Sequence, residues 1–420
     1  MYESNQAIRF DWRSTRLANW HDQAWNHTRP VDAAGIEALE DALPHLLAVP
    51  ARCSRTGPDL AVTVVVHLVE IYQVRGPTDT YLAATEHAVA AARLSGDRLP
   101  EALNARGSCH LRSGSGDLAE RDFREAAGRV TDDAERAWLN GSLALAMAEG
   151  GKVSEGVELL RGAIPMLTGP RRAAAMANLA SLRINQGDTS ADSEQLTRAA
   201  LTEATAHGRH LVAAGIRANL GLLLSRAGRP DEAEQELVRA IDEQRRLRSS
   251  RQLGATLASL AALRLDQGRL DEADALAAEA ETLARRTGYT RALATVLTFR
   301  GLLEVALGDP TEGCRRVDEA EMLTDEATPG WIDLDLVRAV LLAAAGRLDQ
   351  ADAALARGGR EDELVPAVRA HLAAARVRAS RAARVAVEDA DRVAIDAARR
   401  SSPLGLAARF LVAQLPDELA

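Results

Sequence analysis

Histidines are the residues of this sequence whose spacing comes closest to a catalytic or metal-binding pattern. His67 and Glu70 are three residues apart on a predicted helix, so they share a face, and His87 lies on the next predicted helix. A cluster of this kind could hold a metal ion or transfer protons, because imidazole and carboxylate groups do both. A core or groove histidine paired with a carboxylate is the simpler interpretation of the same spacing.

A second pair of histidines flanks a glycine. His207 and His210 lie on either side of Gly208 at a predicted helix junction, where a histidine interacts favourably with the carbonyl end of a helix. A metal site at this junction is the alternative. The sequence has no Walker loop, no strand followed by G-x-G-x-x-G, no H-E-x-x-H and no G-x-S-x-G. We therefore expect no catalytic residues, no metal and no cofactor.

Composition points to a fold made of helices. Alanine makes up about a fifth of the 420 residues, whereas aromatic residues make up only 3%. A core of small and aliphatic side chains suits closely packed helices, because β-sandwiches and barrels are enriched in β-branched and aromatic residues. The sequence therefore predicts an all-α protein.

Charge, cysteine content and apolar runs indicate a cytoplasmic protein. The formal net charge is −9, from 51 basic and 60 acidic residues, so we expect no general affinity for nucleic acid. Cys53, Cys109 and Cys314 are far apart in the sequence, which favours a reducing compartment. The N-terminus lacks the apolar stretch of a signal peptide. The longest apolar run, 60–72, is shorter than the roughly 20 residues that a membrane helix needs.

The sequence repeats itself with a period near 40 residues. The segment ANLGLLLSRAGRPDEAEQELVRAI starts at Ala218, and ASLAALRLDQGRLDEADALAAEAE starts at Ala258. Glycines mark the same point of each repeat: Gly114, Gly151, Gly187, Gly228, Gly268, Gly308 and Gly346. Glycine ends a helix in the left-handed conformation without a steric penalty, and Pro230 and Pro310 suit the first turn of the helix that follows. Each repeat is therefore predicted to be two helices joined by a tight turn.

This pattern resembles the tetratricopeptide repeat (TPR) family, in the long-period form found in kinesin light chains and in the sensor arms of bacterial transcriptional regulators. The matching residues are Leu220, Gly221, Leu224, Ala233, Leu237 and Ala240, then Gly107, Ala119, Phe123 and Ala126, and also Leu143, Ala144, Leu160 and Ala163. The family's tryptophan near the repeat start and its proline near the repeat end are absent from Arg217 and Arg245. The resemblance implies an all-α, right-handed superhelical solenoid of about eight or nine antiparallel helix pairs.

Three regions are expected along the chain. Residues 1–55 form an N-terminal tail and a capping helix, residues 56–360 form the repeat array, and residues 361–420 form C-terminal capping helices, because terminal repeats must turn a polar face to water. The tail contains Trp12, Trp20 and Trp25. A partly ordered cap, a segment that packs into the groove and a disordered tail are the three interpretations of these tryptophans.

An arginine-rich stretch lies in the C-terminal region. It comprises Arg369, Arg376, Arg378, Arg381 and Arg384, with no acidic residue before Glu388. A helix that binds a polyanion is one interpretation, since clustered arginines neutralise phosphates. A solvated outer face of a capping helix is the other interpretation and the one we favour.

Two asparagines are the candidate binding residues. Asn178 and Asn219 occupy matching places in two consecutive repeats, within ANLA and ANLG. In the resembled family, an asparagine at this place on the inner helix often hydrogen-bonds the backbone or terminal carboxylate of a bound peptide. An amide suits that role because it both donates and accepts. Other inner-helix positions nearby are Ser181, Asn185, Leu222 and Arg226, of which Arg226 could meet an acidic group.

A structural role, in which these asparagines satisfy local backbone, is the alternative. The expected function is a module, acting as a scaffold or a sensor, that binds a partner protein or peptide in the concave groove. A second hypothesis is an enzyme or accessory protein of a biosynthetic pathway that uses the groove for a small molecule. A third is a regulator's sensor arm without its own DNA-binding domain. The sequence leaves the partner and homo-oligomerisation open.

Overall fold

The computed structural model describes residues 33–53, 57–75, 79–247, 249–287, 290–323, 334–357, 368–369 and 372–375. Every regular element in these ranges is a helix, which confirms the all-α prediction. None of the described helices is long and apolar enough to cross a membrane. Contacts divide the chain into two units. Unit 1 comprises residues 1–182, 195–216 and 243–249, and unit 2 comprises residues 183–194, 217–242 and 250–420.

The described residues contain eight helix pairs, in agreement with the expected number. The first helices of the pairs are α3 (Pro58–Arg75), α5 (Leu99–Arg112), α7 (Asp133–Glu149), α9 (Gly169–Asn185), α11 (His210–Arg226), α13 (Ser250–Asp266), α15 (Thr290–Leu307) and α17 (Leu334–Ala344). The second helices are α4 (Asp79–Ser95), α6 (Gly116–Arg129), α8 (Val153–Ala163), α10 (Ala191–Ala206), α12 (Pro230–Arg246), α14 (Leu270–Thr287), α16 (Pro310–Leu323) and α18 (Leu348–Arg357). A short 3-10 turn, η2 (Ile164–Met166), extends α8, and one further helix, α2 (Ala33–Cys53), precedes the pairs and packs on α3 and α4.

The seven repeating glycines end the first helices as predicted. Each has a positive φ, between 72° and 85°. At Gly228 the next residue's N–H donates to the carbonyl of Leu224 at 2.9 Å, and the N–H of Gly228 donates to Ser225 at 3.1 Å. This pair of bonds satisfies carbonyls that the helix end leaves without partners. Six of them, all except Gly114, are shown to have open space around the Cβ position, so backbone conformation and not crowding requires a glycine there.

Side chains within a pair interlock small against large. A Cβ added to Gly221 in α11 would lie 2.6 Å from Cγ of Leu237 in α12. At Gly107 in α5 the added atom would lie 2.9 Å from Phe123 of α6. Both large side chains are completely buried, which confirms the alternation of small and large residues expected from the repeat. Because glycine has no Cβ atom, the two helices of these pairs can approach each other closely.

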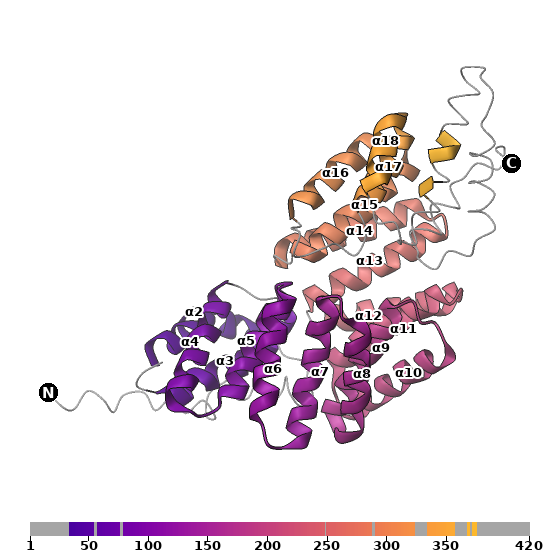
Figure 1. Ribbon diagram of the computed structural model, residues 1–420. Coiled ribbons are helices and arrows are strands. Elements are labelled where there is room, and N and C mark those ends of the chain that lie inside the picture. The colour runs from indigo at the N-terminus through magenta and orange to yellow at the C-terminus, as the bar shows by residue number, and fades with distance from the viewer. Residues whose placement is uncertain are drawn as a thin grey trace, which may run out of the picture. The chain divides into compact units, whose positions relative to one another are not determined.

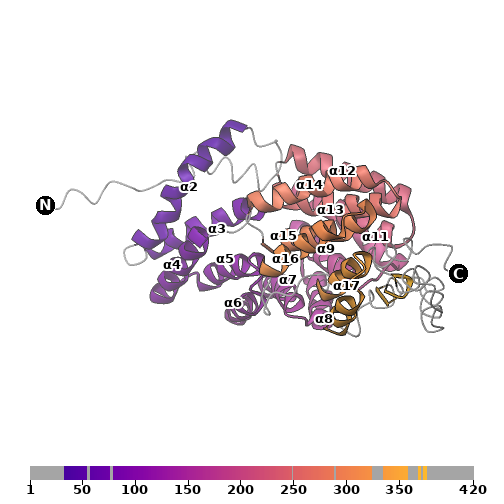
Figure 2. The ribbon, with the colours of Figure 1, turned by 90° about the horizontal axis from the view of Figure 1, so that it is seen from above.

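Successive pairs stack through both of their helices. In unit 1 the second helix α6 packs on α7, while the first helices α3, α5 and α7 contact one another in turn. In unit 2 the same order holds for α14 on α15 and for the first helices α13, α15 and α17. Figures 1 and 2 show these helices side by side within each unit. The first helices therefore form a continuous face in each unit, which we call the first-helix face.

Some expectations lie outside the described residues. These are the N-terminal tail with its three tryptophans and the arginine stretch from 376 onward, whereas Arg369 is described and exposed. Near the C-terminus, Val368, Leu372 and Ala375 join the core cluster that contains Val337 and Leu341 of α17. The three regions proposed from the sequence therefore remain predictions.

Two glycines near α8 give a matched test of the turn argument. Gly151 has a φ of 83°, whereas Gly162 lies inside α8, and both have open space at the Cβ position. We expect Gly151→Ala to destabilise the protein by about 1 to 2 kcal/mol, because alanine resists the left-handed conformation. Gly162→Ala should stabilise it by about 0.5 to 1 kcal/mol, because alanine favours helix. Urea unfolding of both variants measures these changes, and equal effects would contradict the explanation.

Candidate functional site

The first candidate asparagine lies on the first helix α9, within unit 1. Asn178 and Ser181 are half-buried on α9, and Asn178 directly precedes the buried Leu179. The amide of Asn178 makes no hydrogen bond with any part of the chain that the structure describes. Its polar atoms are not sealed from solvent either. A donor and an acceptor are therefore available to a ligand at this point.

The second candidate asparagine has the same setting in unit 2. Asn219 is half-buried on α11 directly before the buried Leu220, and its amide also lacks a hydrogen-bond partner among the described residues. Leu222 is half-buried on the same helix, and Asn185 is exposed at the end of α9. Both asparagines thus precede a core leucine of their own repeat, which is the match that the sequence predicts.

Arg226 has an intramolecular contact that the sequence did not indicate. Its guanidinium donates a hydrogen bond to the backbone carbonyl of Ile184 in the last turn of α9. Arginine near a helix C-terminus satisfies carbonyls that the helix leaves open. We therefore assign Arg226 a part in holding α11 to the end of α9, in addition to any contact with a ligand.

The structure describes only part of the histidine pattern expected from the sequence. His87, His207 and His210 are exposed, and the side chains of His67 and Glu70 lie outside the described residues. Within the described ranges, no group of three or more histidine, cysteine or carboxylate side chains is placed to hold a metal ion. Cys53, Cys109 and Cys314 are free thiols.

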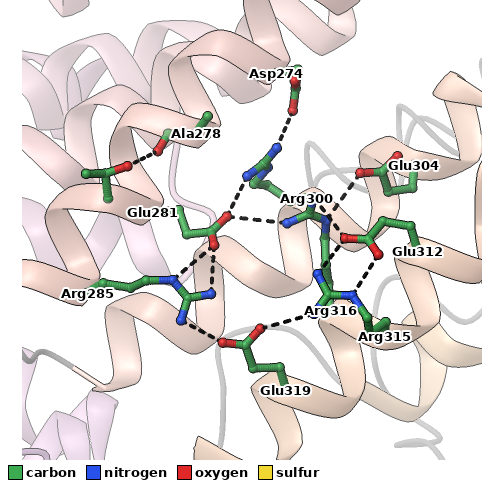
Figure 3. A network of polar contacts seen from close by, with 11 residues as sticks. Asp274, Ala278, Glu281, Arg285, Arg300, Glu304, Glu312, Arg315, Arg316 and Glu319 are labelled. Carbon is green, nitrogen blue, oxygen red and sulfur yellow. Dashed lines mark hydrogen bonds and ion pairs between the residues drawn. The ribbon is translucent and has the colours of Figure 1, made fainter.

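A buried ionic network in unit 2 is the feature that sequence reasoning missed. Figure 3 shows it between α14, α15 and α16, with Glu281 at its centre. Glu281 accepts from Arg285 at 2.8 Å, from Arg300 at 2.6 Å and from Arg316 at 3.4 Å, so one carboxylate ties three helices together. The side chains of Glu281, Arg300 and Arg316 are only 12%, 13% and 13% exposed.

Two members of the network occupy places that are apolar in the repeat of α11. Arg300 and Glu304 on α15 stand eight and four residues before Gly308, where α11 has Leu220 and Leu224 before Gly228. Both leucines are completely buried. The repeat alignment therefore contained a signal for buried ion pairs, because α5 has Arg106 and His110 at the same two places and α17 has Arg338 at the first of them. The partners on α14 and α16 could not be predicted from that alignment.

Ion pairing controls the protonation of the central carboxylate. Burial raises the pKa of Glu281, but hydrogen bonds from Arg300 and Arg285 outweigh burial, so its pKa lies below the ordinary value. Glu281 is consequently ionised at neutral pH. A depressed carboxylate pKa stabilises the folded state above the unfolded-state pKa, and this stabilisation disappears as the pH falls through the folded-state value.

A smaller polar cluster lies in unit 1. Arg106 on α5 donates to both oxygens of Asp122 on α6, at 2.7 and 2.8 Å, and Asp122 is 1% exposed. His110 lies one turn along α5, with its Nε2 4.0 Å from Asp122. Burial lowers the pKa of His110, although Asp122 raises it in part. The contacts hold α5 against α6.

Removing the central carboxylate tests the importance of the unit 2 network. We expect Glu281→Ala to destabilise unit 2 by about 3 kcal/mol, because it leaves Arg300 and Arg316 with less compensation in a buried position. The control is Glu158→Ala, which breaks an exposed pair with Arg161 and should cost less than about 0.5 kcal/mol. Chemical unfolding at pH 7 measures both changes. Similar values for the two variants would show that the network contributes little.

Apolar replacement separates stability from charge. The quadruple variant Glu281→Ile, Arg300→Leu, Glu304→Leu and Arg316→Leu copies the residues at the equivalent places Ile241, Leu220, Leu224 and Leu276, so neither buried arginine is left without its carboxylates. It should be as stable as the original protein or more stable by about 1 to 4 kcal/mol. It should also lose less stability between pH 7 and pH 3, because the ionised Glu281 is gone. An unchanged pH dependence of unfolding would contradict the assignment of Glu281.

Comparison with known structures identifies the fold, whereas comparison of sequences identifies no family. No protein-family model matches the chain, and no curated sequence is significantly similar to it. The chain resembles the crystal structure of a Rap protein complexed with competence and sporulation factor, with a TM-score of 0.60 and 15% identity over 86% of this chain and 98% of that one.

A second similar structure is the STAND protein with a tetratricopeptide repeat sensor from Pyrococcus horikoshii. Its TM-score is 0.51 and its identity 12%, over 81% of this chain and 51% of that one. These likenesses agree with the helix pairs, the glycine turns and the small-to-large contacts found along the chain. The chain therefore has the fold of the tetratricopeptide-like helical repeat proteins.

Proposed function

We propose that the protein is a non-catalytic interaction module that binds a partner polypeptide through amides on its first helices. The observation that carries this proposal is the pair of asparagine amides without internal partners. Asn178 in unit 1 and Asn219 in unit 2 each hold a donor and an acceptor at the same place of their repeats. Among the described residues neither amide bonds nearby backbone, which supports the proposal over the structural alternative.

The chemistry of an amide suits a polypeptide ligand. A side-chain amide pairs with the N–H and C=O of an extended chain whatever the ligand's side chains are. Half-buried Leu222 and Ser181 beside the asparagines would add apolar and small polar contact. The similar Rap protein was solved in complex with competence and sporulation factor, so a protein of this fold binds a second molecule. That likeness supports the proposal without naming the partner of this chain.

A paired substitution tests the role of the amides. Asn178→Ala combined with Asn219→Ala should leave helicity and the melting temperature nearly unchanged, because neither amide holds the fold together. The same change should weaken partner capture at least tenfold, which is about 1.4 kcal/mol for two lost hydrogen bonds. Affinity capture from the native host, followed by quantitative mass spectrometry, identifies the partner, and titration of the purified partner then measures its affinity.

The matched control uses amides on the other helices. Gln195 on α10 and Gln235 on α12 are exposed residues of the second helices in the same two repeats. Gln195→Ala with Gln235→Ala should bind the partner as the original protein does. If the asparagine variant also binds normally, or if both variants lose binding equally, the first-helix face is not the binding site.

A further inference from the structure

A charged hollow lies on the second helices of unit 1. Its volume is about 390 Å³. It is lined by Asp117, Glu120, Arg121, Arg124 and Glu125 of α6 and by Lys152, the residue before α8. The hollow has no lining residue from a first helix, so a ligand here would not occupy the proposed peptide site.

Glu120 is a buried carboxylate that orders the cations of the hollow. It is 4% exposed and accepts from Lys152 Nζ at 3.0 and 3.2 Å, while Arg124 forms an ion pair with it at 2.6 Å. Burial raises the pKa of Glu120, but the hydrogen bonds from Lys152 and Arg124 outweigh burial. The pKa therefore lies below its ordinary value, and the carboxylate stays ionised. Both cations are thereby held in place, yet each keeps N–H donors that Glu120 does not use, since an ammonium has three and a guanidinium five.

Arg121 supplies a cation that the protein does not neutralise by contact. It is exposed on α6, three residues before Arg124, so both guanidinium groups emerge from one side of the helix. It takes part in no ion pair or hydrogen bond within the described ranges. Every other cation lining the hollow has a carboxylate partner there.

Two further arginines hold one of the lining carboxylates. Glu125 is bound on its two sides by Arg93 at 3.0 Å and by Arg129 at 3.2 Å. The six lining residues themselves are three cations and three carboxylates, so the lining is balanced in charge. The preference for an anionic ligand therefore rests on Arg121, the lining cation that no carboxylate contacts among the described residues.

We propose that this hollow binds a compact anion with two or more negative charges, such as a phosphate ester or a dicarboxylate. Arg121 would be its principal contact, and Lys152 and Arg124 would use their spare donors, because charge-assisted hydrogen bonds to guanidinium are strong and directional. The volume is within the range of small-molecule sites. Nucleic acid fits less well, since its affinity depends on many phosphate contacts and the net charge of the chain opposes it.

Ligand binding here would couple two consecutive repeats. Lys152 follows α7 in the turn to α8, whereas the arginines belong to α6, so an anion that contacts both sides adds a link between the pairs. The direct bond of Lys152 to Glu120 already makes this connection. Lys152 is the only lysine among the 51 lysine and arginine residues, and its compact ammonium group reaches the buried carboxylate of Glu120.

Titration of the full-length protein with small anions tests the proposal. Inorganic phosphate, pyrophosphate and succinate are added at constant ionic strength, and binding is followed by calorimetry. Saturable binding is expected, and Arg121→Gln should weaken it at least tenfold without affecting folding, because Arg121 is exposed and unpaired. Tighter binding of the phosphates would identify a phosphate-bearing ligand, and tighter binding of succinate would identify a dicarboxylate.

The control variant makes the same substitution at an arginine outside the hollow. Arg161 on α8 is 47% exposed and pairs with Glu158, so Arg161→Gln removes an exposed guanidinium of similar setting. This variant should bind the anions as the original protein does. The proposal is overturned if none of the three anions shows saturable binding, or if Arg121→Gln binds as tightly as Arg161→Gln. Neither outcome bears on the first-helix face.

Discussion

The close approach of two helices within each pair is the constraint on which the rest of the structure depends. Gly301 of α15 faces Val317 of α16, 16 residues later, and the same interval separates the glycine from the large residue in α5–α6 and in α11–α12. The constraint also passes from pair to pair. A Cβ at Gly156 in α8 would meet the carbonyl of Ala144 at 2.6 Å and Leu182 of the next pair at 3.5 Å. Each pair is thus completed by its neighbour, as repeat architectures require.

This constraint limits which side chains a first helix can have where it packs on second helices. Where a first helix meets the second helices, its side chains must be apolar, as Leu220 and Leu224 are, or charged with buried partners, as Arg300 and Glu304 are. A buried ion pair contributes little stability beyond what apolar residues of the same size provide. A buried charge that loses its partner is strongly destabilising. The network therefore restricts which helices can pack together in unit 2, because each buried charge needs its partner on the neighbouring helix.

The sequence was informative wherever structure is determined locally. A glycine at a helix end, a proline in a first turn and a small residue opposite a large one each depend on a short stretch of chain, and all were predicted correctly. The network around Glu281 was not, because its members lie up to 35 residues apart and depend on how three helices stack. The contact of Arg226 with Ile184, 42 residues away, was missed for the same reason.

The candidate site shows a different limit. Sequence matching placed Asn178 and Asn219 correctly on first helices, but it could not show that their amides lack internal partners, since that depends on every group around them. In a helix, asparagine is less favourable than alanine by roughly half a kcal/mol. Neither amide offsets that cost by a hydrogen bond within the described chain. Within the described residues neither these amides nor the guanidinium of Arg121 has a hydrogen-bond or ion-pair partner, and for this reason both proposals assign them a partner in a bound ligand.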